Sequence, residues 1–558
     1  MLEPTNDQIA IRDHPSLSLL AIAPAGCGKT EALALRVAAL ATLGTILPPR
    51  RILVTTFTNK AKENITERLS AYLPPSLLRE RVTIANFHGL SARIFRAHAN
   101  VIGMDPAAII PDSDWVAEQC RLRNFSYPTA QKIQKILQTI KQDDISDFEV
   151  EARLLHSGET QALEIEHLRI SEGRLTYHDL PRVASLILAH DAVADLYRNH
   201  FAAIIVDEFQ DLTPQQLRII NRIGTGKTTY AGDLAQGIYS FAGADPAQIY
   251  AAITAECVDR IEFSESHRSS PAVLHAVNAL TELTGGIHLS AARPQSWPGG
   301  GLVAKLDYTD AAAEARGVVN LCRYILERGS KLRIGVIARI SNRRRFVDAA
   351  FTDSDLPFSR WDDGVLDTDT AKIIKSMLAT LDATEFENSD SPLAQLRERA
   401  GLDTIQDPDT RKSLVDAIDW CHDLLQAGEL PHDIRKRIRA SGSSLIDITG
   451  VHLLSGHAGK GQQFDWVIAL GLEDDHIPYY EAKTPELVSE EARILSVILS
   501  RARHGAFLTV AADVPNKQGG TWPKKPSRFW ENLTGTYLDR TQAVQWLDNA
   551  DWEQLQAR

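Results

Sequence analysis

The segment AIAPAGCGKT at residues 21–30 combines small residues with a lysine and a threonine, a pattern suited to binding phosphate groups. The apolar run at 19–22 predicts a buried strand, and EALALRVAAL at 31–40 predicts a helix. A strand, a small-residue turn and a helix N-terminus direct free backbone N–H groups toward an anion. Lys29 would then reach the outer phosphates, and the hydroxyl of Thr30 would ligate Mg²⁺. Ala23 stands where the usual pattern has its first glycine, so a second signal is needed.

The second signal is IIVDEFQD at residues 204–211, where an apolar strand ends in two carboxylates. Asp207 could hold the Mg²⁺ shell, and Glu208 could orient or deprotonate an attacking water molecule. Such a pair is by itself usually a solvated strand end. Together with the phosphate-binding pattern, it predicts nucleotide hydrolysis.

The composition describes a large acidic protein. A chain of 558 residues is expected to form several domains. No apolar run reaches the roughly 18 residues of a membrane span, and the polar start MLEPTNDQ does not resemble a signal peptide. Five scattered cysteines without a CxxC pair argue against a zinc or iron–sulfur site and suit the cytoplasm. A net charge of −12 does not suggest a nucleic-acid binder, although it does not exclude a local binding groove.

The order of the predicted elements indicates an α/β fold with two parallel-sheet lobes, because apolar strands alternate with helical stretches in two blocks. Each lobe is interrupted by a segment with the i, i+3, i+4 apolar spacing of helices. The predicted division is a first lobe at 1–95 and 175–255, its helical insertion at 96–174, a second lobe at 256–370 and 441–558, and its helical insertion at 371–440.

Further segments resemble the motifs of the UvrD/Rep/PcrA family of superfamily 1A helicases and occur in that family's order. The matching segments are TNDQ (5–8), 52–69, 83–96, LTYHDL (175–180), 231–244, 263–274, 448–474 and 490–510. The resemblance implies two RecA-like lobes that bind ATP and Mg²⁺ between them. It also implies an ATP-dependent 3′→5′ translocase or helicase acting on single-stranded DNA. The insertion at 371–440 occupies the place of the family's 2B subdomain but is less than half as long.

The resemblance assigns the nucleotide-binding residues by position. The phosphate loop comprises Ala25, Gly26, Cys27, Gly28, Lys29 and Thr30. Gln8 would read the adenine, Arg36 matches a position near the base, and His267 replaces the aromatic residue that stacks on the base. Gln463 stands in KGQQF where the family has a glutamate. Cys27 is interpreted as a small turn residue rather than a redox switch.

The resemblance also assigns residues that respond to the γ-phosphate. Arg268 and Arg501 would reach it from the second lobe as arginine fingers, which are typically worth about 10³-fold or more in rate. Gln210 and Gln236 match family positions that sense this phosphate and relay its presence to DNA.

The residues expected to contact DNA follow the family's strand-tracking path. They are Phe57, Thr58, Asn59, Phe87, His88, Tyr239, Phe241 and His457. Aromatic rings stack on bases without sequence preference, at about 1–3 kcal/mol per base. For Phe57 and Phe87 the alternative is a place in the core. Ala242 replaces a family arginine, which predicts a weaker grip on DNA or weaker coupling.

A second interpretation is a DNA-end-sensing ATPase subunit that regulates a partner without processive unwinding. The short insertion at 371–440, Ala242 and Gln463 favour it. In size and architecture the chain is similar to the short UvrD-like proteins of Gabija-type antiviral defence, which accompany an OLD-family nuclease. The expected partners are therefore single-stranded DNA or DNA with single-stranded ends, and either such a nuclease or repair proteins. No membrane partner is expected.

Overall fold

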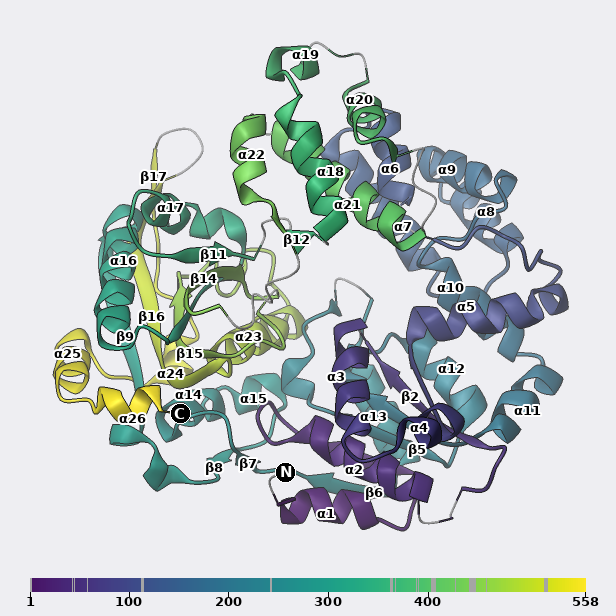
Figure 1. The fold of residues 1–558 in the computed structure, drawn as a ribbon, viewed down its shortest axis with the longest axis horizontal. Helices are drawn as coiled ribbons and strands as arrows, with labels where there is room; N and C mark the ends of the chain where they lie inside the picture. The colour runs from purple at the N-terminus through teal and green to yellow at the C-terminus, as the bar shows by residue number, and fades with distance from the viewer. Residues whose placement is uncertain are drawn as a thin grey trace. The chain divides into compact units, whose positions relative to one another are not determined.

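The structure is a computed structural model of the 558-residue chain. It describes all residues except 1–2, 43, 45, 58, 112–114, 241–242, 362–364, 367, 388, 390, 403–407, 427, 441–447, 458, 516–519 and 558. The chain divides into two compact units (Figure 1). Unit 1 comprises Met1–Pro294 and Thr484–Ser496, and unit 2 comprises Gln295–Lys483 and Val497–Arg558.

Unit 1 is built on a six-stranded sheet in which every pairing is parallel. Its strands, in spatial order, are β3 (Val82–Asn86), β2 (Arg51–Thr56), β4 (Phe201–Asp207), β5 (Thr228–Gly232), β1 (Leu19–Ile22) and β6 (Asp259–Glu262). Alternate residues of β4 enter different cores, since Ile204 packs on one face of the sheet and Ile205 on the other. The strands are therefore buried on both faces, as is usual for parallel sheets between helices.

Helices cover both faces of this sheet. One core is formed with α1 (Asn6–Asp13), α2 (Lys29–Thr42), α3 (Asn59–Ser70) and α14 (Pro271–Asn278). The other is formed with α5 (Phe87–His98), α10 (Asp179–Leu188), α11 (Asp191–His200), α12 (Pro214–Gly224) and α13 (Pro246–Glu256). The unit also contains short elements, namely α4 (Pro75–Arg81), η1 (Ala99–Ile102), α15 (Thr281–Thr284), η2 (Phe209–Asp211), η3 (Leu234–Gln236), β7 (Glu265–Ser266) and β8 (Ser290–Ala291).

The first lobe extends further along the chain than the sequence predicted. Strand β6 pairs with β1, and unit 1 continues to Pro294 rather than ending at residue 255. The short strand DRIE at 259–262 has alternating exposure instead of a continuous apolar run, so its place at the sheet edge was not visible in the sequence.

A helical insertion within unit 1 has a core of its own. Its helices are α6 (Trp115–Leu122), α7 (Tyr127–Ile140), α8 (Asp147–His156) and α9 (Thr160–Ser171). Apolar residues at helical spacing, such as Ile133 with Leu137 and Val150 with Leu154, pack together in this core.

Unit 2 contains a second, mainly parallel sheet. Its order is β11 (Phe358–Arg360), β14 (Gly450–Ser455), β10 (Arg333–Ala338), β15 (Phe464–Leu470), β16 (Ala502–Pro515) and β17 (Thr521–Pro523), and β9 (Leu302–Asp310) also pairs with β16. Only the pairing of β17 with β16 is antiparallel among these strands. The surrounding helices are α16 (Ala311–Arg328), α17 (Ser341–Thr352), α24 (Trp530–Leu533), α25 (Arg540–Asp548) and α26 (Trp552–Gln556). The two parallel sheets confirm the predicted fold class.

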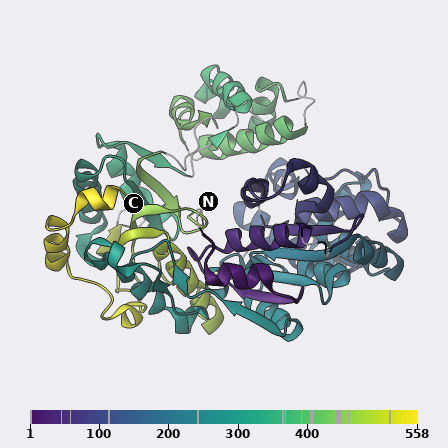
Figure 2. The same ribbon diagram turned by 60° about the horizontal axis from the view of Figure 1, so that its bottom comes forward.

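Unit 2 also carries a small helical bundle (Figure 2). It consists of α18 (Thr368–Ala379), α19 (Ala383–Glu387), α20 (Pro392–Arg399), α21 (Pro408–Gln426) and α22 (Pro431–Arg437), which share a separate apolar core. The chain enters through β12 (Val365–Leu366) and leaves through β13 (Arg439–Ala440), and these two strands pair in parallel.

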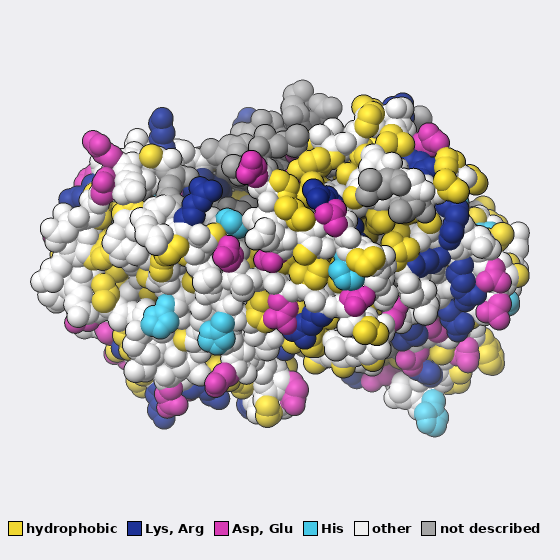
Figure 3. Space-filling model, turned by 90° about the horizontal axis from the view of Figure 1, so that it is seen from below, with side chains coloured by type: hydrophobic (Ala, Val, Ile, Leu, Met, Phe, Trp, Pro, Cys, Tyr) yellow, Lys and Arg dark blue, Asp and Glu magenta, His cyan; other side chains and the backbone are white. Residues whose placement is uncertain are grey.

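Two surface properties bear on possible partners. On the face drawn in Figure 3, Lys and Arg side chains lie interspersed with Asp and Glu. A role in nucleic-acid binding must therefore be argued from particular residues. None of the helices in the described part of the chain has the length and apolar character needed to span a membrane.

Candidate nucleotide and DNA site

The predicted phosphate loop joins β1 to α2, and α2 begins at Lys29. Gly26 and Gly28 have φ angles of +87° and +84°, a region that side chains with a Cβ rarely enter. A Cβ on Gly26 would lie 2.5 Å from the Cβ of Arg268, and one on Gly28 would lie 2.5 Å from Nε2 of Gln8. Glycine is thus required at both positions for conformation and for space.

Lys29 meets both predicted carboxylates. Its Nζ lies 3.1 Å from Oδ1 of Asp207 and 2.6 Å from Oε2 of Glu208, where β4 ends. Burial opposes the charge of Lys29, but the two carboxylates raise its pKa above the ordinary value. Burial also raises the pKa of Asp207, although Lys29 acts in the opposite direction. Glu208 has φ +58°, so a strained backbone holds its carboxylate at this place.

A polar network extends from Glu208 toward the end of β5. Nε2 of Gln210 donates to Oε2 of Glu208 at 2.6 Å, and its Oε1 accepts from the backbone N–H of Asp233 at 3.0 Å. Gly232 permits this approach, since a Cβ there would lie 2.2 Å from Oε1 of Gln210. Nε2 of Gln236 donates to Oδ2 of Asp233 at 2.9 Å. Burial raises the pKa of Asp233, which the hydrogen bond from Gln236 opposes.

Asp233 was not identified from the sequence. The only local signal was a carboxylate directly after the buried strand TTYAG, which resembles the end of β4. Gln210 and Gln236 were predicted to respond to the γ-phosphate, and the structure joins both of them to Asp233. The network therefore connects the end of β4 with the turn that follows β5.

Gln8 and His267 lie beside the phosphate loop. Nε2 of Gln8 donates to the carbonyl of Gly28 at 3.2 Å, and a capping box with Thr5 fixes the start of α1. The backbone N–H of His267 donates to the carbonyl of Gly26 at 3.0 Å, while its side chain is exposed. The predicted contacts of both side chains with a base stay predictions.

Arg268 requires a correction. It was expected to approach from the second lobe, but it belongs to unit 1, and its Cβ lies against Gly26 of the phosphate loop. The cause is that β6 pairs with β1 in the first sheet. The residues that follow β6, including β7 and Arg268, therefore also belong to unit 1. Arg268 therefore belongs to the same unit as the phosphate loop.

Arg36 belongs to α2, and its predicted position near the base stays a prediction. It is fully buried and donates to the carbonyls of Ile11, His14 and Ser16 and to Oγ1 of Thr229. Burial lowers its pKa to about 10. These bonds fasten the loop after α1 to β5, so Arg36 has a structural role.

Cys27 lies in the phosphate loop and is 2% exposed. Burial raises the pKa of its thiol to about 12, and the nearby charge of Asp233 acts in the same direction. A buried, protonated thiol is a poor nucleophile. This supports the interpretation of Cys27 as a small turn residue.

The predicted DNA residues of unit 1 fall into four groups. Phe57 and Tyr239 stack on each other, with ring centroids 5.2 Å apart and planes inclined by 21°. His88 makes an edge contact with Tyr177 at 5.5 Å. Phe87 is 3% exposed and belongs to the core, which corrects its assignment to the DNA path. Thr58, Phe241 and Ala242 lie outside the described residues, as does the side chain of Asn59.

Three predicted residues lie in unit 2. Arg501 is 2% exposed, and its Nε donates to the carbonyl of Val497 at 3.0 Å. Gln463 is exposed, and His457 is half-buried. Their contacts with nucleotide or DNA stay predictions.

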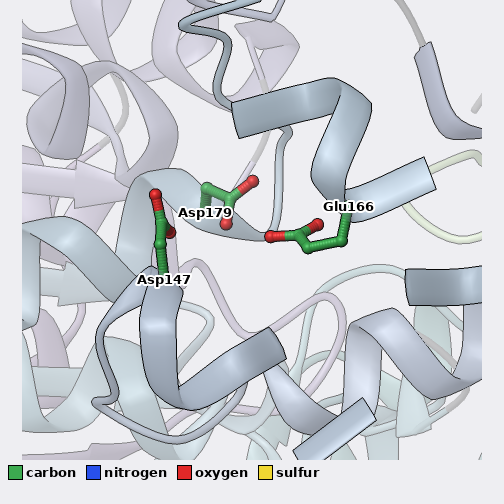
Figure 4. Close-up of side chains that lie close together, drawn as sticks. All are labelled: Asp147, Glu166 and Asp179. Atoms are coloured by element: carbon green, nitrogen blue, oxygen red, sulfur yellow. The ribbon is translucent and has the colours of Figure 1, made fainter. Parts of the chain in front are cut away.

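One group of three carboxylates among the described residues is close enough to hold a cation. Asp147, Glu166 and Asp179 point toward one another from α8, α9 and α10 (Figure 4). Lys141, Arg169 and Arg182 already neutralise this group. It is therefore an internal ion-pair network rather than a metal site.

Comparisons with known proteins agree with this geometry. A model of the UvrD/REP helicase N-terminal domain matches residues 5–255, and one of the UvrD-like helicase C-terminal domain matches residues 429–513. Together these matches cover more than half of the chain. The chain belongs to the UvrD/Rep-like family of superfamily 1A DNA helicases.

Several relatives of this UvrD-like chain carry helicase names. The ATP-dependent DNA helicase UvrD2 of Mycobacterium tuberculosis is 25% identical over 92% of this chain and 79% of its own length. The putative ATP-dependent DNA helicase YjcD of Bacillus subtilis is 23% identical over the same shares. DNA helicase II of Escherichia coli is 27% identical over 62% of this chain and 49% of its own length.

The UvrD-like chain is thus an enzyme of the ATP-dependent DNA helicase class, and its residues fit the nucleotide and ion this class uses. Gly26 and Gly28 give the loop its left-handed backbone conformation, and Lys29 supplies a buried positive charge. The carboxylate of Asp207 is a ligand type that Mg²⁺ prefers, as is the hydroxyl of Thr30. Bound Mg²⁺ would neutralise phosphate charge there.

Proposed function

We propose that this UvrD-like enzyme hydrolyses ATP at the phosphate loop and uses the energy to move 3′→5′ along single-stranded DNA. The observation that carries the proposal is the meeting of Lys29 with Asp207 and Glu208 at the carboxyl ends of parallel strands. In open α/β sheets, ligands bind at these ends. The direction of movement rests on the family resemblance.

Each residue of this cluster has a separate task. Lys29 stabilises the negative charge that develops on the transferred phosphate. Asp207 and Thr30 would hold the magnesium ion. Glu208 orients the attacking water and accepts its proton, and Gln210 fixes the Glu208 carboxylate through its 2.6 Å hydrogen bond. Phosphate groups would replace the carboxylates as partners of Lys29, which would release Glu208 for this work.

The same network reaches the proposed DNA path. Gln236 is bonded to Asp233, and Tyr239 follows only three residues later. Tyr239 stacks on Phe57, which directly follows β2. A base could extend this stack at about 1–3 kcal/mol. Loss of the γ-phosphate could therefore affect Tyr239, whose ring would hold DNA, through the three-residue segment from Gln236 to Tyr239.

A second candidate function is a DNA-end-sensing subunit that hydrolyses ATP as a signal to a partner nuclease. The observation in its favour is the small size of the α18–α22 bundle, which fills the place of a much larger family subdomain. In relatives that subdomain contacts duplex DNA and regulates unwinding. An enzyme with a reduced version could bind and sense DNA without unwinding it processively.

The deciding experiment measures steady-state ATP hydrolysis by the purified chain with and without single-stranded DNA. Strand displacement is measured in parallel on duplexes with a 3′ tail or a 5′ tail. We expect DNA-stimulated hydrolysis and unwinding from the 3′ tail alone. Lys29→Ala should abolish hydrolysis, while Lys132→Ala, on the exposed surface of α7, should leave it unchanged.

The other outcomes are equally informative. Hydrolysis that responds to DNA ends without strand displacement would favour the sensor. Unwinding from the 5′ tail would contradict the proposed direction. Hydrolysis that persists in Lys29→Ala would overturn the assignment of the phosphate loop.

A further inference from the structure

Helix α23 (Pro485–Leu499) is shared by the two units. Its residues up to Ser496 belong to unit 1, and from Val497 onward the chain belongs to unit 2. Arg501, a predicted arginine finger, follows two residues after the helix ends. What fastens α23 within unit 1 therefore bears on how the two units communicate.

Arg493 provides such an attachment. Its Nε donates to the backbone carbonyl of Thr284 at 3.2 Å, and Thr284 is the last residue of α15. Carbonyls at a helix C-terminus carry partial negative charge and favour cations. Burial lowers the pKa of Arg493, and the negative charges of Glu490, Asp233 and Asp245 oppose this effect.

The end of α15 packs directly on η3, the turn that carries Gln236. A Cβ on Gly285 would lie 2.8 Å from Cδ2 of Leu234, and one on Gly286 would lie 2.9 Å from the Cβ of Ala235. Gly285 also has φ +72°, so a left-handed turn brings the chain onto η3. There is no room for a side chain between the two turns.

A continuous set of contacts thus runs from α23 to the proposed catalytic carboxylate. Arg493 holds the end of α15, α15 packs on η3, and η3 is flanked by Asp233 and Gln236. Gln210 then joins Asp233 to Glu208. Every one of these contacts lies within unit 1.

We propose that Arg493 is a positioning residue that couples the Glu208 network to α23 and, through this helix, to the segment that bears Arg501. This inference rests on the proposed function. A residue of this kind should affect DNA-stimulated turnover more than the binding of ATP, because its side chain bonds to the end of α15 rather than to the phosphate loop. A merely structural role would instead lower the stability of the protein. It would leave the ratio of DNA-stimulated to DNA-independent ATP hydrolysis unchanged.

The test compares Arg493→Met with Arg493→Lys. Arg493→Met keeps the length of the side chain but removes its charge and its donors. We expect the DNA-stimulated kcat to fall about five- to tenfold while KM for ATP changes less than about twofold. Arg493→Lys should restore most of the loss, because its ammonium can still donate to the Thr284 carbonyl. Glu486→Gln, exposed in the first turn of α23, is the matched control.

A double-mutant cycle with Leu234→Ala tests the route. If Arg493 acts through η3, the double variant should lose little more than the more impaired single variant. Gly285→Ala, which forces a Cβ onto Leu234, should reproduce the effect without changing Arg493 and serves if Arg493→Met does not fold. Additive losses, or an unchanged stimulated kcat in Arg493→Met, would overturn the inference. A wild-type enzyme without DNA stimulation would instead contradict the proposed function.

Discussion

Glu208 shows how a single residue is prepared for chemistry. A glutamate with φ +58° is uncommon, and such backbone strain costs on the order of 1–3 kcal/mol. The ion pair with Lys29 and the hydrogen bond from Gln210 hold the strained conformation. The backbone and two side chains thus fix the direction of the Glu208 carboxylate.

At the residue scale, Tyr239 is the sharpest test of the DNA path. Tyr239→Ala should weaken binding of single-stranded DNA by about 1–3 kcal/mol, because it removes one face of the stack with Phe57. Hydrolysis of ATP without DNA should stay close to the wild-type rate. Fluorescence anisotropy with a labelled oligonucleotide measures the change in affinity.

Tyr197→Ala is the matched control for this variant. Tyr197 is also a half-buried tyrosine of unit 1, but it packs on Phe201, where β4 begins, at the opposite end of the strands. Its removal should leave the DNA affinity unchanged. Equal affinities of Tyr239→Ala and the wild type would remove Tyr239 from the DNA path.

At the scale of elements, a buried ion network joins the helical insertion to α10. Asp179 accepts from Lys141 at 3.0 Å and from the backbone N–H of Thr176 at 2.9 Å. Burial by itself would raise the pKa of Asp179, but Arg169, Lys141 and Arg182 hold it well below the ordinary value. This explains the segment LTYHDL, whose aspartate serves the junction rather than the nucleotide.

Asp179→Asn should lower the free energy of unfolding of unit 1 by about 3–5 kcal/mol, because it leaves buried cations without their main partner. Urea denaturation followed by circular dichroism measures the loss. Because the folded-state pKa of Asp179 is depressed, its stabilisation is present above the unfolded-state pKa. It is lost as the pH falls through the folded-state value, so the deficit of the variant should shrink in acid.

A matched exposed pair sets the baseline for this prediction. Asp355 contacts Arg323 at 2.8 Å on the surface of unit 2, where solvent screens the charges. Asp355→Asn should leave the unfolding midpoint nearly unchanged. If Asp179→Asn behaves in the same way, the network contributes no more than a surface ion pair.

How much the sequence could predict depends on the range of the contacts involved. Lys29, Asp207 and Glu208 were found because each stands at the end of a strand or the start of a helix, which local patterns record. Asp233 and Arg493 depend on contacts between distant segments, which no spacing rule encodes.

The errors have the same origin. Phe87 opens α5 with a side chain that turns into the core, and the sequence alone left its place open between the core and the DNA path. Arg268 was assigned to the second lobe because β6 is too short and too polar to be recognised as a sheet strand. The place of Phe87 depends on which face of α5 is buried, and that of Arg268 depends on which sheet β6 joins. Only tertiary packing fixes either of them.

At the scale of the whole molecule, each unit combines a parallel sheet with a helical insertion that has its own core. The chain passes between the units after Pro294, after Lys483 and after Ser496. The third crossing lies inside α23, where a continuous helix rather than a loop makes the connection.

The bundle of unit 2 can be tested by excision. Strands β12 and β13 pair in parallel, so the two ends of the bundle lie side by side and a short Gly–Ser linker can replace residues 368–438. We expect DNA-stimulated hydrolysis of ATP to stay within about threefold, because the main core of unit 2 contains no residue of the bundle. Strand displacement should fall if the bundle holds duplex DNA as its larger family counterpart does.

The excised protein also separates the two candidate functions. Loss of strand displacement with retained hydrolysis would assign unwinding to the bundle and support a translocase that engages duplex DNA. If the full-length protein shows no strand displacement and the excised protein hydrolyses ATP at the same rate, the bundle would be available to bind a partner. That result would favour the DNA-end sensor. Loss of hydrolysis with an intact thermal transition would contradict the prediction, since it would make the bundle part of the ATP-hydrolysing machinery.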